Sequence, residues 1–205
     1  MSAALPALLS GASLIVYASA LVAVHVQTSF AGVRRHFVSE YANGSQGQVI
    51  QVGFAAWCSS LVLAAVAAAN DCTASRTQRR VLAALLATAA LGVAAIAAFK
   101  TETVAGALPP GETRGPGGRA HDYAGVVLQA ALLAAVVVSL PMRWSSRTER
   151  RAVAVLVAAA LAAAAVLAVI GPSVAGIRQR VLIAAAVAWQ ALFLRRIWTL
   201  GRGGS

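Results

Sequence analysis

Six apolar stretches dominate this 205-residue chain. They cover residues 5–27, 49–69, 81–99, 123–142, 152–170 and 181–200. A helix of about 20 residues, rising about 1.5 Å per residue, crosses a hydrocarbon core about 30 Å thick, and each stretch has close to that length. The sequence therefore predicts an all-α fold, an integral membrane bundle of six transmembrane helices that forms a single domain over residues 1–205.

The distribution of charge supports a membrane protein. Charged residues make up only 11% of the chain, and the mean hydropathy is +0.77; soluble domains carry about 25% charged residues. No Lys, Arg, Asp or Glu lies inside the first five stretches. Arg195 and Arg196 lie near the end of the sixth, where long side chains can snorkel to the interface. The absence of an acidic or basic residue at mid-membrane depth argues against ion-coupled transport.

The first stretch resembles a signal peptide only in part. The segment 18–20 (ASA) is an acceptable cleavage motif, but the residues before the stretch contain no Lys or Arg. The apolar run also continues past Ala20. We therefore expect an uncleaved first helix.

The net charge of +11 has a membrane explanation. If both termini are cytoplasmic, ten basic residues lie in the inner segments and seven in the outer loops, a bias that follows the positive-inside rule. We therefore expect membrane lipids, and no nucleic acid, as partners; the sequence leaves protein partners unknown. Cys58 and Cys72 have no metal-binding or redox spacing.

The outer loops of this topology carry most of the polar motifs. They are residues 28–48, 100–122 and 171–180, and they contain four of the six acidic residues. His36 and His121 lie in them, and His25 lies within a turn of the first helix's outer end. The second of these loops is long and rich in Gly and Pro, a composition that resists regular structure.

Four short motifs in these regions resemble one known family. They are SEYA at 39–42, FKTE at 99–102, GRAHD at 118–122 and GIRQR at 176–180. In this order and with this six-helix layout, the chain resembles domain-of-unknown-function family 998 (DUF 998), a group of prokaryotic multi-pass membrane proteins. Glu102 replaces the Asp that is usual in the family. The resemblance implies the six-helix fold and a prokaryotic plasma membrane location, with no settled activity.

The leading functional hypothesis is a polar site on the extracytoplasmic face that binds a lipid headgroup or a small anionic ligand. Arg178 and Arg180 are suited to a phosphate, and an Arg180–Glu40 contact would join the first outer loop to the last helix. Asp122 directly precedes the fourth apolar stretch and is a candidate N-cap for it. The candidate ligand-binding residues are Ser39, Glu40, Tyr41, Glu102, His121, Asp122 and Arg180.

Two other hypotheses remain open. Three histidines near several carboxylates would suit a Zn²⁺ site in a metal-assisted, membrane-embedded hydrolase acting on lipid. His25, His36 and His121 are weak candidate ligands, because the sequence contains neither HxxxH nor HExxH. In the third hypothesis the protein is a non-catalytic structural membrane protein. Tyr41 and the four tryptophans are also expected as interface anchors: Trp57, Trp144, Trp189 and Trp198.

Overall fold

The computed structural model of the protein describes residues 3–105 and 107–202. Six of its helices are long and apolar enough to span a membrane, which confirms the predicted all-α membrane bundle. They are α1 (Ala4–Val26), α3 (Gly47–Ala69), α4 (Arg76–Ala98), α5 (Pro116–Ser139), α6 (Arg147–Ile170) and α7 (Ala175–Arg202). Three short elements lie between them: α2 (Phe30–Arg35) and the 3-10 helices η1 (Val38–Asn43) and η2 (Pro172–Val174).

α4 and α6 begin earlier than their apolar stretches because a serine caps the first turn of each. Ser75 accepts a hydrogen bond from the backbone N–H of Gln78 and completes a capping box at α4, and Ser146 caps α6. α5 begins at Pro116, so Asp122 lies inside the helix, and its prediction as the N-cap was wrong. α5 also ends at Ser139 rather than at residue 142, because a turn follows it.

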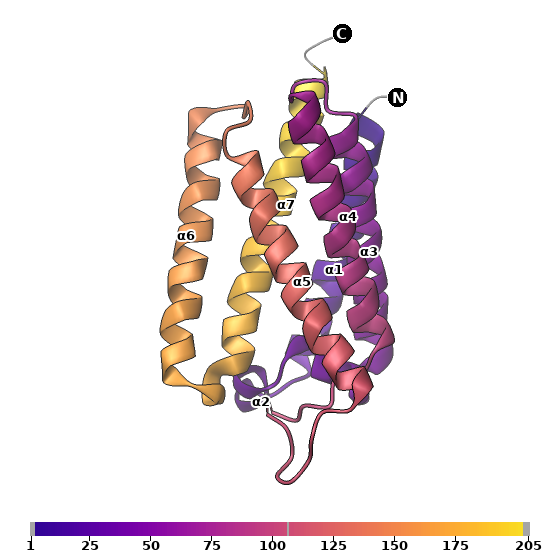
Figure 1. Cartoon of the computed structure of the whole chain (residues 1–205), viewed down its shortest axis with the longest axis vertical. Helices are drawn as coiled ribbons and strands as arrows, with labels where there is room; N and C mark the ends of the chain where they lie inside the picture. Colours follow the sequence, from indigo (N-terminus) through magenta and orange to yellow (C-terminus); the bar gives the residue numbers. More distant parts are fainter. Residues whose placement is uncertain (1–2, 106, 203–205) are drawn as a thin grey trace.

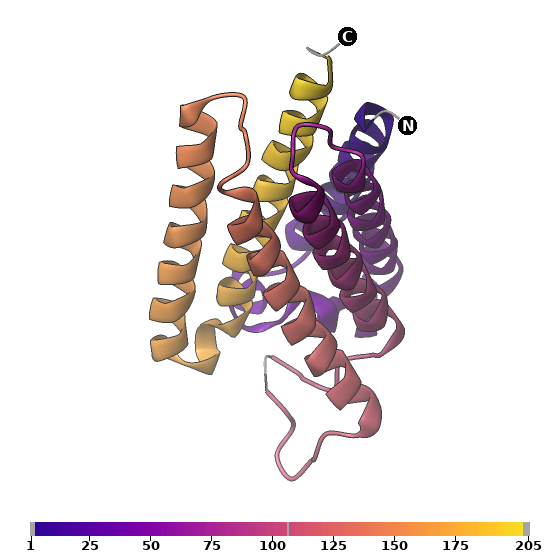
Figure 2. The same cartoon turned by 45° about the horizontal axis from the view of Figure 1, so that its top comes forward.

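The helices form a bundle whose two ends differ. α1, α3, α4 and α5 pack successively, and α7 returns to pack against α1 (Figures 1 and 2). The start of α1 and the end of α7 lie at one end, here called the terminal end. The opposite end, here called the loop end, carries the connections 27–46, 99–115 and 171–174. This arrangement brings the three predicted outer loops together.

The core between the helices contains aromatic and amide side chains, including tryptophans that the sequence predicted at the membrane interface. The rings of Tyr17 and Trp57 stack with centroids 4.6 Å apart. The indole N–H of Trp57 donates to Gln190, whose amide donates to Ser60. Trp57, Trp144 and Trp189 are buried, so their prediction as interface anchors was wrong: their N–H groups satisfy polar acceptors inside the bundle.

The terminal end contains a buried ion pair. Arg196 is fully buried, and its guanidinium donates to the Asp71 carboxylate at 2.5 Å. It also donates to the Thr73 hydroxyl at 2.8 Å and to the Arg143 carbonyl at 2.5 Å. The expectation that Arg196 snorkels was therefore wrong, because these acceptors hold its charge inside the protein. The Arg195 side chain does reach the surface.

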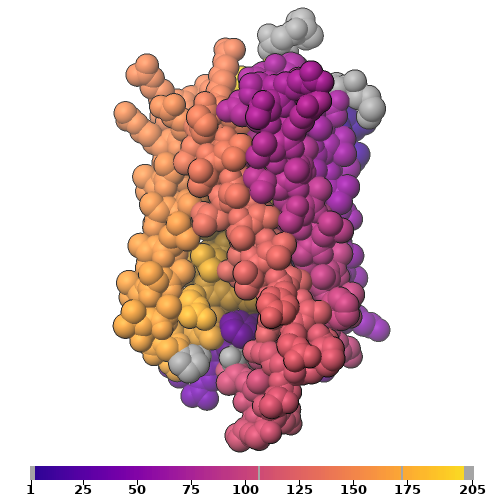
Figure 3. Space-filling view, viewed as in Figure 1, coloured from indigo at the N-terminus to yellow at the C-terminus, as the bar shows by residue number. Residues whose placement is uncertain are grey.

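α6 is the least embedded of the membrane-spanning helices. Only Val153 and Ala160 of α6 are buried, and its main partner is α7. Figure 3 shows a hollow between α5 and α6 in which α7 is visible. α7 packs against α6 on one side and against α1 and α2 on the other, and it makes few contacts with α5.

Candidate functional site

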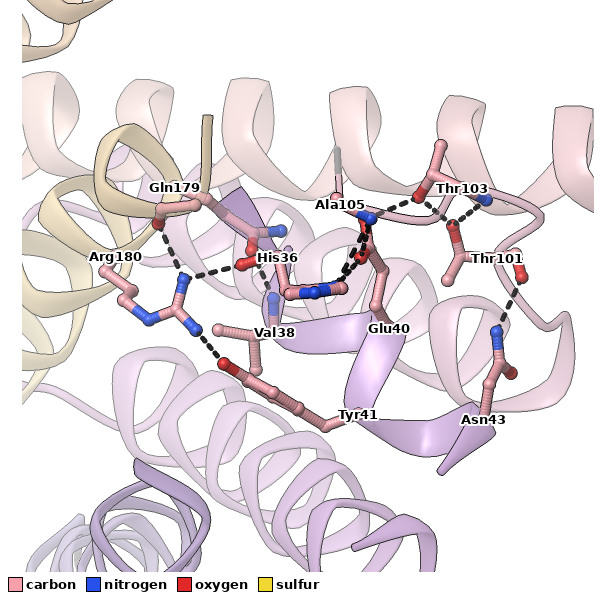
Figure 4. A network of polar contacts seen from close by, with 11 residues as sticks. His36, Val38, Glu40, Tyr41, Asn43, Thr101, Thr103, Ala105, Gln179 and Arg180 are labelled. Atoms are coloured by element: carbon pink, nitrogen blue, oxygen red, sulfur yellow. Dashed lines mark hydrogen bonds and ion pairs between the residues drawn. The ribbon is translucent and has the colours of Figure 1, made fainter. Parts of the chain in front are cut away.

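Arg180 is the centre of the polar network at the loop end (Figure 4). It projects from the second turn of α7 and donates to the Tyr41 hydroxyl at 2.8 Å. It also donates to the carbonyl oxygens of His36 at 2.7 Å and Gly176 at 2.9 Å, and its Nε–H donates to His25 Nε2. These four bonds use most of the guanidinium's five N–H groups. Arg180 therefore fixes the segment after α1 against α7.

Glu40 is the second charged member of the network. Its carboxylate is buried and accepts from His36 Nδ1 at 2.5 Å, from the Thr103 hydroxyl at 2.9 Å and from the Ala105 backbone N–H at 2.9 Å. Ala105 has a positive φ of 54°, a backbone conformation that is uncommon for a residue other than glycine. Glu40 thus ties η1 to the long loop before α5.

His36 connects the two charged side chains. Its ring contacts Glu40, and its backbone carbonyl accepts from Arg180. The Val38 N–H donates to the Gln179 side chain at 2.7 Å, a further tie between η1 and α7. Gly176 permits this close approach, since a Cβ there would lie 2.5 Å from the carbonyl oxygen of His36. The 39–42 and 176–180 motifs therefore form one structural unit.

Of the other candidate residues, Glu102, His121 and Asp122 lie outside this unit, whereas Ser39 belongs to it. His121 is buried, and its Nδ1 contacts the Phe99 carbonyl oxygen at 2.7 Å. Asp122 forms an ion pair with Arg114 at 2.7 Å. Ser39 is buried within η1. The candidates therefore separate into a central network around Glu40, Tyr41 and Arg180 and a set of contacts near the start of α5.

Glu102 caps α5 from the preceding loop. Its carboxylate accepts from the N–H of Gly115 at 2.8 Å and of Gly118 at 3.2 Å. A negative charge is favourable at a helix N-terminus, where these N–H groups have no partner within the helix. A Cβ on Gly118 would lie 2.3 Å from a Glu102 carboxylate oxygen, whereas one on Gly117 would have nothing within 4 Å. The sequence did not indicate this capping role.

Replacing Gly118 with alanine is expected to displace the Glu102 carboxylate from the start of α5. We expect a loss of about 1–2 kcal/mol in the free energy of unfolding, from the lost cap and the crowding. Thermal unfolding of the detergent-purified protein measures it as a fall in Tm of about 2–8 °C. Gly117→Ala is the matched control and is expected to cause no loss; an equal loss in both variants would contradict the capping role.

A pocket opens beside the central network. It has a volume of about 400 Å³, within the range of small-molecule sites. His36, Glu40 and Tyr41 line one part of it, and the end of α1, α2 and the segment before α3 line the rest. The remaining lining residues are Gln27, Thr28, Ser29, Gly32, Gly44, Ser45 and Gln46.

The comparison with protein families agrees with the motifs. The profile of one family, described as "Protein of unknown function (DUF998)", matches residues 10–196. The chain belongs to DUF998. No curated protein and no solved structure matches it. The match covers nearly the whole chain: it includes both motifs of the central network and all or most of each membrane-spanning helix.

The three histidines of this DUF998 protein have separate partners. His25 Nδ1 contacts the Leu21 carbonyl at 2.5 Å, and its Nε2 accepts from Arg180, so His25 is a neutral ring protonated on Nδ1. His36 contacts Glu40, and His121 contacts a backbone carbonyl. Across residues 3–105 and 107–202, no group of three or more His, Cys, Asp or Glu side chains is arranged to hold a metal ion. The described geometry gives the zinc hydrolase hypothesis no support.

Sequence reasoning missed several members of the network in this DUF998 protein. Thr103 and the Ala105 N–H bind Glu40, and Asn43 donates to the Thr101 carbonyl at 2.8 Å. These residues lie in the irregular Gly- and Pro-rich loop or at the end of η1, where no α-helical periodicity indicates which way a side chain points. The only sequence signal for the contact between Gln179 and the Val38 N–H was the position of Gln179 in the 176–180 motif.

Proposed function

We propose that the loop-end pocket binds a phosphate-bearing anionic group, either a lipid headgroup or a small soluble phosphate. The observation that carries this proposal is the position of His36, Glu40 and Tyr41, which line the pocket and are held by the central network. A family motif that contributes to the wall of a cavity at a membrane surface favours binding over packing alone.

The charge at the loop end supports an anionic ligand. The three predicted outer loops, residues 28–48, 100–122 and 171–180, together contain seven basic and four acidic residues. Three of these acids have partners within the protein: Glu40 binds His36, Glu102 caps α5 and Asp122 pairs with Arg114. The surrounding positive charge attracts anionic groups over about 8–10 Å at physiological salt.

The lining of the pocket supplies hydrogen-bonding groups for a polar ligand. Ser29 and Ser45 carry exposed hydroxyl groups, and the Gln46 amide donates to Gln27 across the pocket. Arg35 is exposed on the same short helix as Gly32, a lining residue. In this proposal Arg35 attracts the phosphate, the hydroxyl and amide groups orient it, and Arg180 acts as a positioning residue that holds Tyr41.

The proposal includes an orientation in the membrane. The loop end faces the outside of a prokaryotic plasma membrane, and both termini are cytoplasmic. The arginines that flank the two short terminal-end connections support this orientation, since short loops flanked by Arg stay in the cytoplasm. They are Arg76, Arg79 and Arg80 at the start of α4, Arg143 after α5, and Arg147, Arg150 and Arg151 at the start of α6.

Replacing Gly44 with tryptophan is expected to fill the pocket without disturbing its walls. A Cβ on Gly44 meets only the Tyr41 carbonyl oxygen, at 3.9 Å, and the backbone φ of −109° suits any residue. We expect phosphatidylglycerol retention in native mass spectrometry to fall about tenfold, equivalent to about 1.4 kcal/mol. Gly117→Trp is the matched control, because Gly117 also has open space and does not line the pocket.

The outcomes separate the two ligand sources. Competition by inorganic phosphate would identify a soluble phosphate ligand, and retention that phosphate does not affect would identify a lipid headgroup. Equal retention by wild type and Gly44→Trp would exclude binding in this pocket.

A purely structural role is the second candidate function. This role is favoured because the Arg180 guanidinium already donates to four acceptors within the protein. If the wild-type protein retains neither phosphatidylglycerol nor phosphate, this candidate remains and the binding proposal fails.

A further inference from the structure

A second hollow lies on the membrane-facing side of the bundle, between α3 and α4. It has a volume of about 480 Å³ and belongs to the loop-end half of both helices. Phe54 is buried at its base, and Ala94, Ala97 and Ala98 leave it open because their side chains are small. None of its lining residues contributes to the loop-end pocket. We call this hollow the α3–α4 groove.

Two polar contacts hold the walls of the groove together. The Gln51 amide donates to the Ala97 carbonyl at 3.2 Å, near the loop end. The Cys58 thiol donates to the Ala90 carbonyl at 3.5 Å, about 10 Å deeper along α3 at 1.5 Å per residue. These contacts join α3 to α4 at two depths. The groove between them is therefore a fixed feature of the helix pair.

The surroundings restrict what the groove can hold. Both helices are long and apolar enough to span a membrane, and the groove lies within their spans. Phe54 and the alanines offer an apolar surface, which an aliphatic chain covers better than water does. Acyl chains are the molecules present at this depth of a bilayer.

From the middle of the membrane toward the loop end, the residues of the groove match the parts of a glycerophospholipid in order: acyl chain, ester and phosphate. Deepest are Cys58 and Phe54, which suit an acyl chain. Gln51 follows toward the loop end, with one amide hydrogen and its carbonyl oxygen available for the ester region beyond the bond to Ala97. Lys100 is exposed two residues after Ala98, at the depth of a headgroup phosphate. We propose that the α3–α4 groove binds one acyl chain of an anionic glycerophospholipid, with Lys100 at its phosphate.

Photo-cross-linking tests this proposal on the full chain. The protein is reconstituted with phosphatidylglycerol that carries a diazirine midway along one acyl chain, and labelled peptides are mapped by mass spectrometry. We expect labelling concentrated in 51–58 and 94–98. Ala94→Phe fills the groove and is expected to reduce labelling there about fivefold or more. Ala87→Phe is the matched control, because Ala87 is exposed one heptad away on the same face of α4 and does not line the groove.

A second variant tests the headgroup. Lys100→Gln is expected to reduce labelling by phosphatidylglycerol about fivefold, the effect of one basic residue near an anionic lipid, and to leave labelling by the phosphatidylcholine analogue unchanged. Labelling spread evenly over all lipid-facing helices, unaffected by Ala94→Phe, would overturn the proposal. An equal effect of Lys100→Gln on both lipids would overturn the assignment of an anionic lipid. Gly44→Trp is expected to leave this labelling unchanged, so failure here and failure of the loop-end pocket are distinguishable.

Discussion

Replacing Asp71 with alanine is expected to lower the free energy of unfolding by about 3–5 kcal/mol. The substitution leaves the fully buried guanidinium of Arg196 without its carboxylate partner. An unpaired charge in a protein interior loses its hydration and gains no compensating attraction. Asp71 also accepts from the hydroxyl and backbone N–H of Thr73, so the loop between α3 and α4 loses its anchor as well.

Thermal unfolding in a neutral detergent measures this effect. Arg195→Ala is the control: its side chain is 66% exposed and lies 3.7 Å from Glu149, so the loss is expected to be at most about 1 kcal/mol. The double variant Asp71→Leu with Arg196→Met removes both charges and is expected to recover most of the lost stability. Similar losses in Asp71→Ala and Arg195→Ala would show that the buried ion pair is not a major determinant of stability.

The sequence predicted the membrane helices well and their ends less well. A run of about 20 apolar residues admits few interpretations, because backbone N–H and C=O groups in a hydrocarbon core must bond within the segment. Helix ends depend instead on polar residues outside the run. Ser75 and Ser146 begin α4 and α6 before the apolar residues do, and Gly115 with Pro116 begins α5. Hydropathy contains no information about these caps.

The candidate site was predictable as a set of residues but not as a set of contacts. The family motifs identified Glu40, Tyr41 and Arg180, which the structure brings into one network. His36 links Glu40 to Arg180 through its ring nitrogen and its backbone carbonyl, and no sequence pattern predicts such contacts. Similarly, hydropathy treated Arg196 as an interfacial residue because its partner Asp71 lies 125 positions away in a loop.

α7 is fixed at both ends by arginine. Arg180 binds the segment after α1 at the loop end, and Arg196 binds the connections after α3 and α5 at the terminal end. Between these positions the contacts of α7 with α5 are few, and the space-filling view shows the hollow beside it (Figure 3). The two polar clusters therefore position α7 where apolar packing is incomplete, and removal of either arginine should affect the whole bundle.

Replacing Arg180 with alanine is expected to lower the free energy of unfolding by about 2–4 kcal/mol, because hydrogen bonds from a charged donor contribute about 1.5–3 kcal/mol each and the freed acceptors regain some water. Arg180→Lys is expected to recover less than half of the loss, since an ammonium group cannot reproduce the planar arrangement of donors that reaches Tyr41, His25 and two carbonyls. Arg178→Ala, two residues earlier in α7, is the control and is expected to change stability by at most about 0.5 kcal/mol.

A double-mutant cycle with Glu40→Gln tests whether the network acts as one unit. Because His36 joins both charged side chains, the losses from Arg180→Ala and Glu40→Gln are expected to be non-additive by about 1 kcal/mol. The combination of Arg180→Ala with Asp71→Ala, at the opposite end of the bundle, is the additive reference. Additivity in both cycles would mean that Glu40 and Arg180 stabilise η1 independently. The contacts of His36 with both side chains would then carry no energetic coupling.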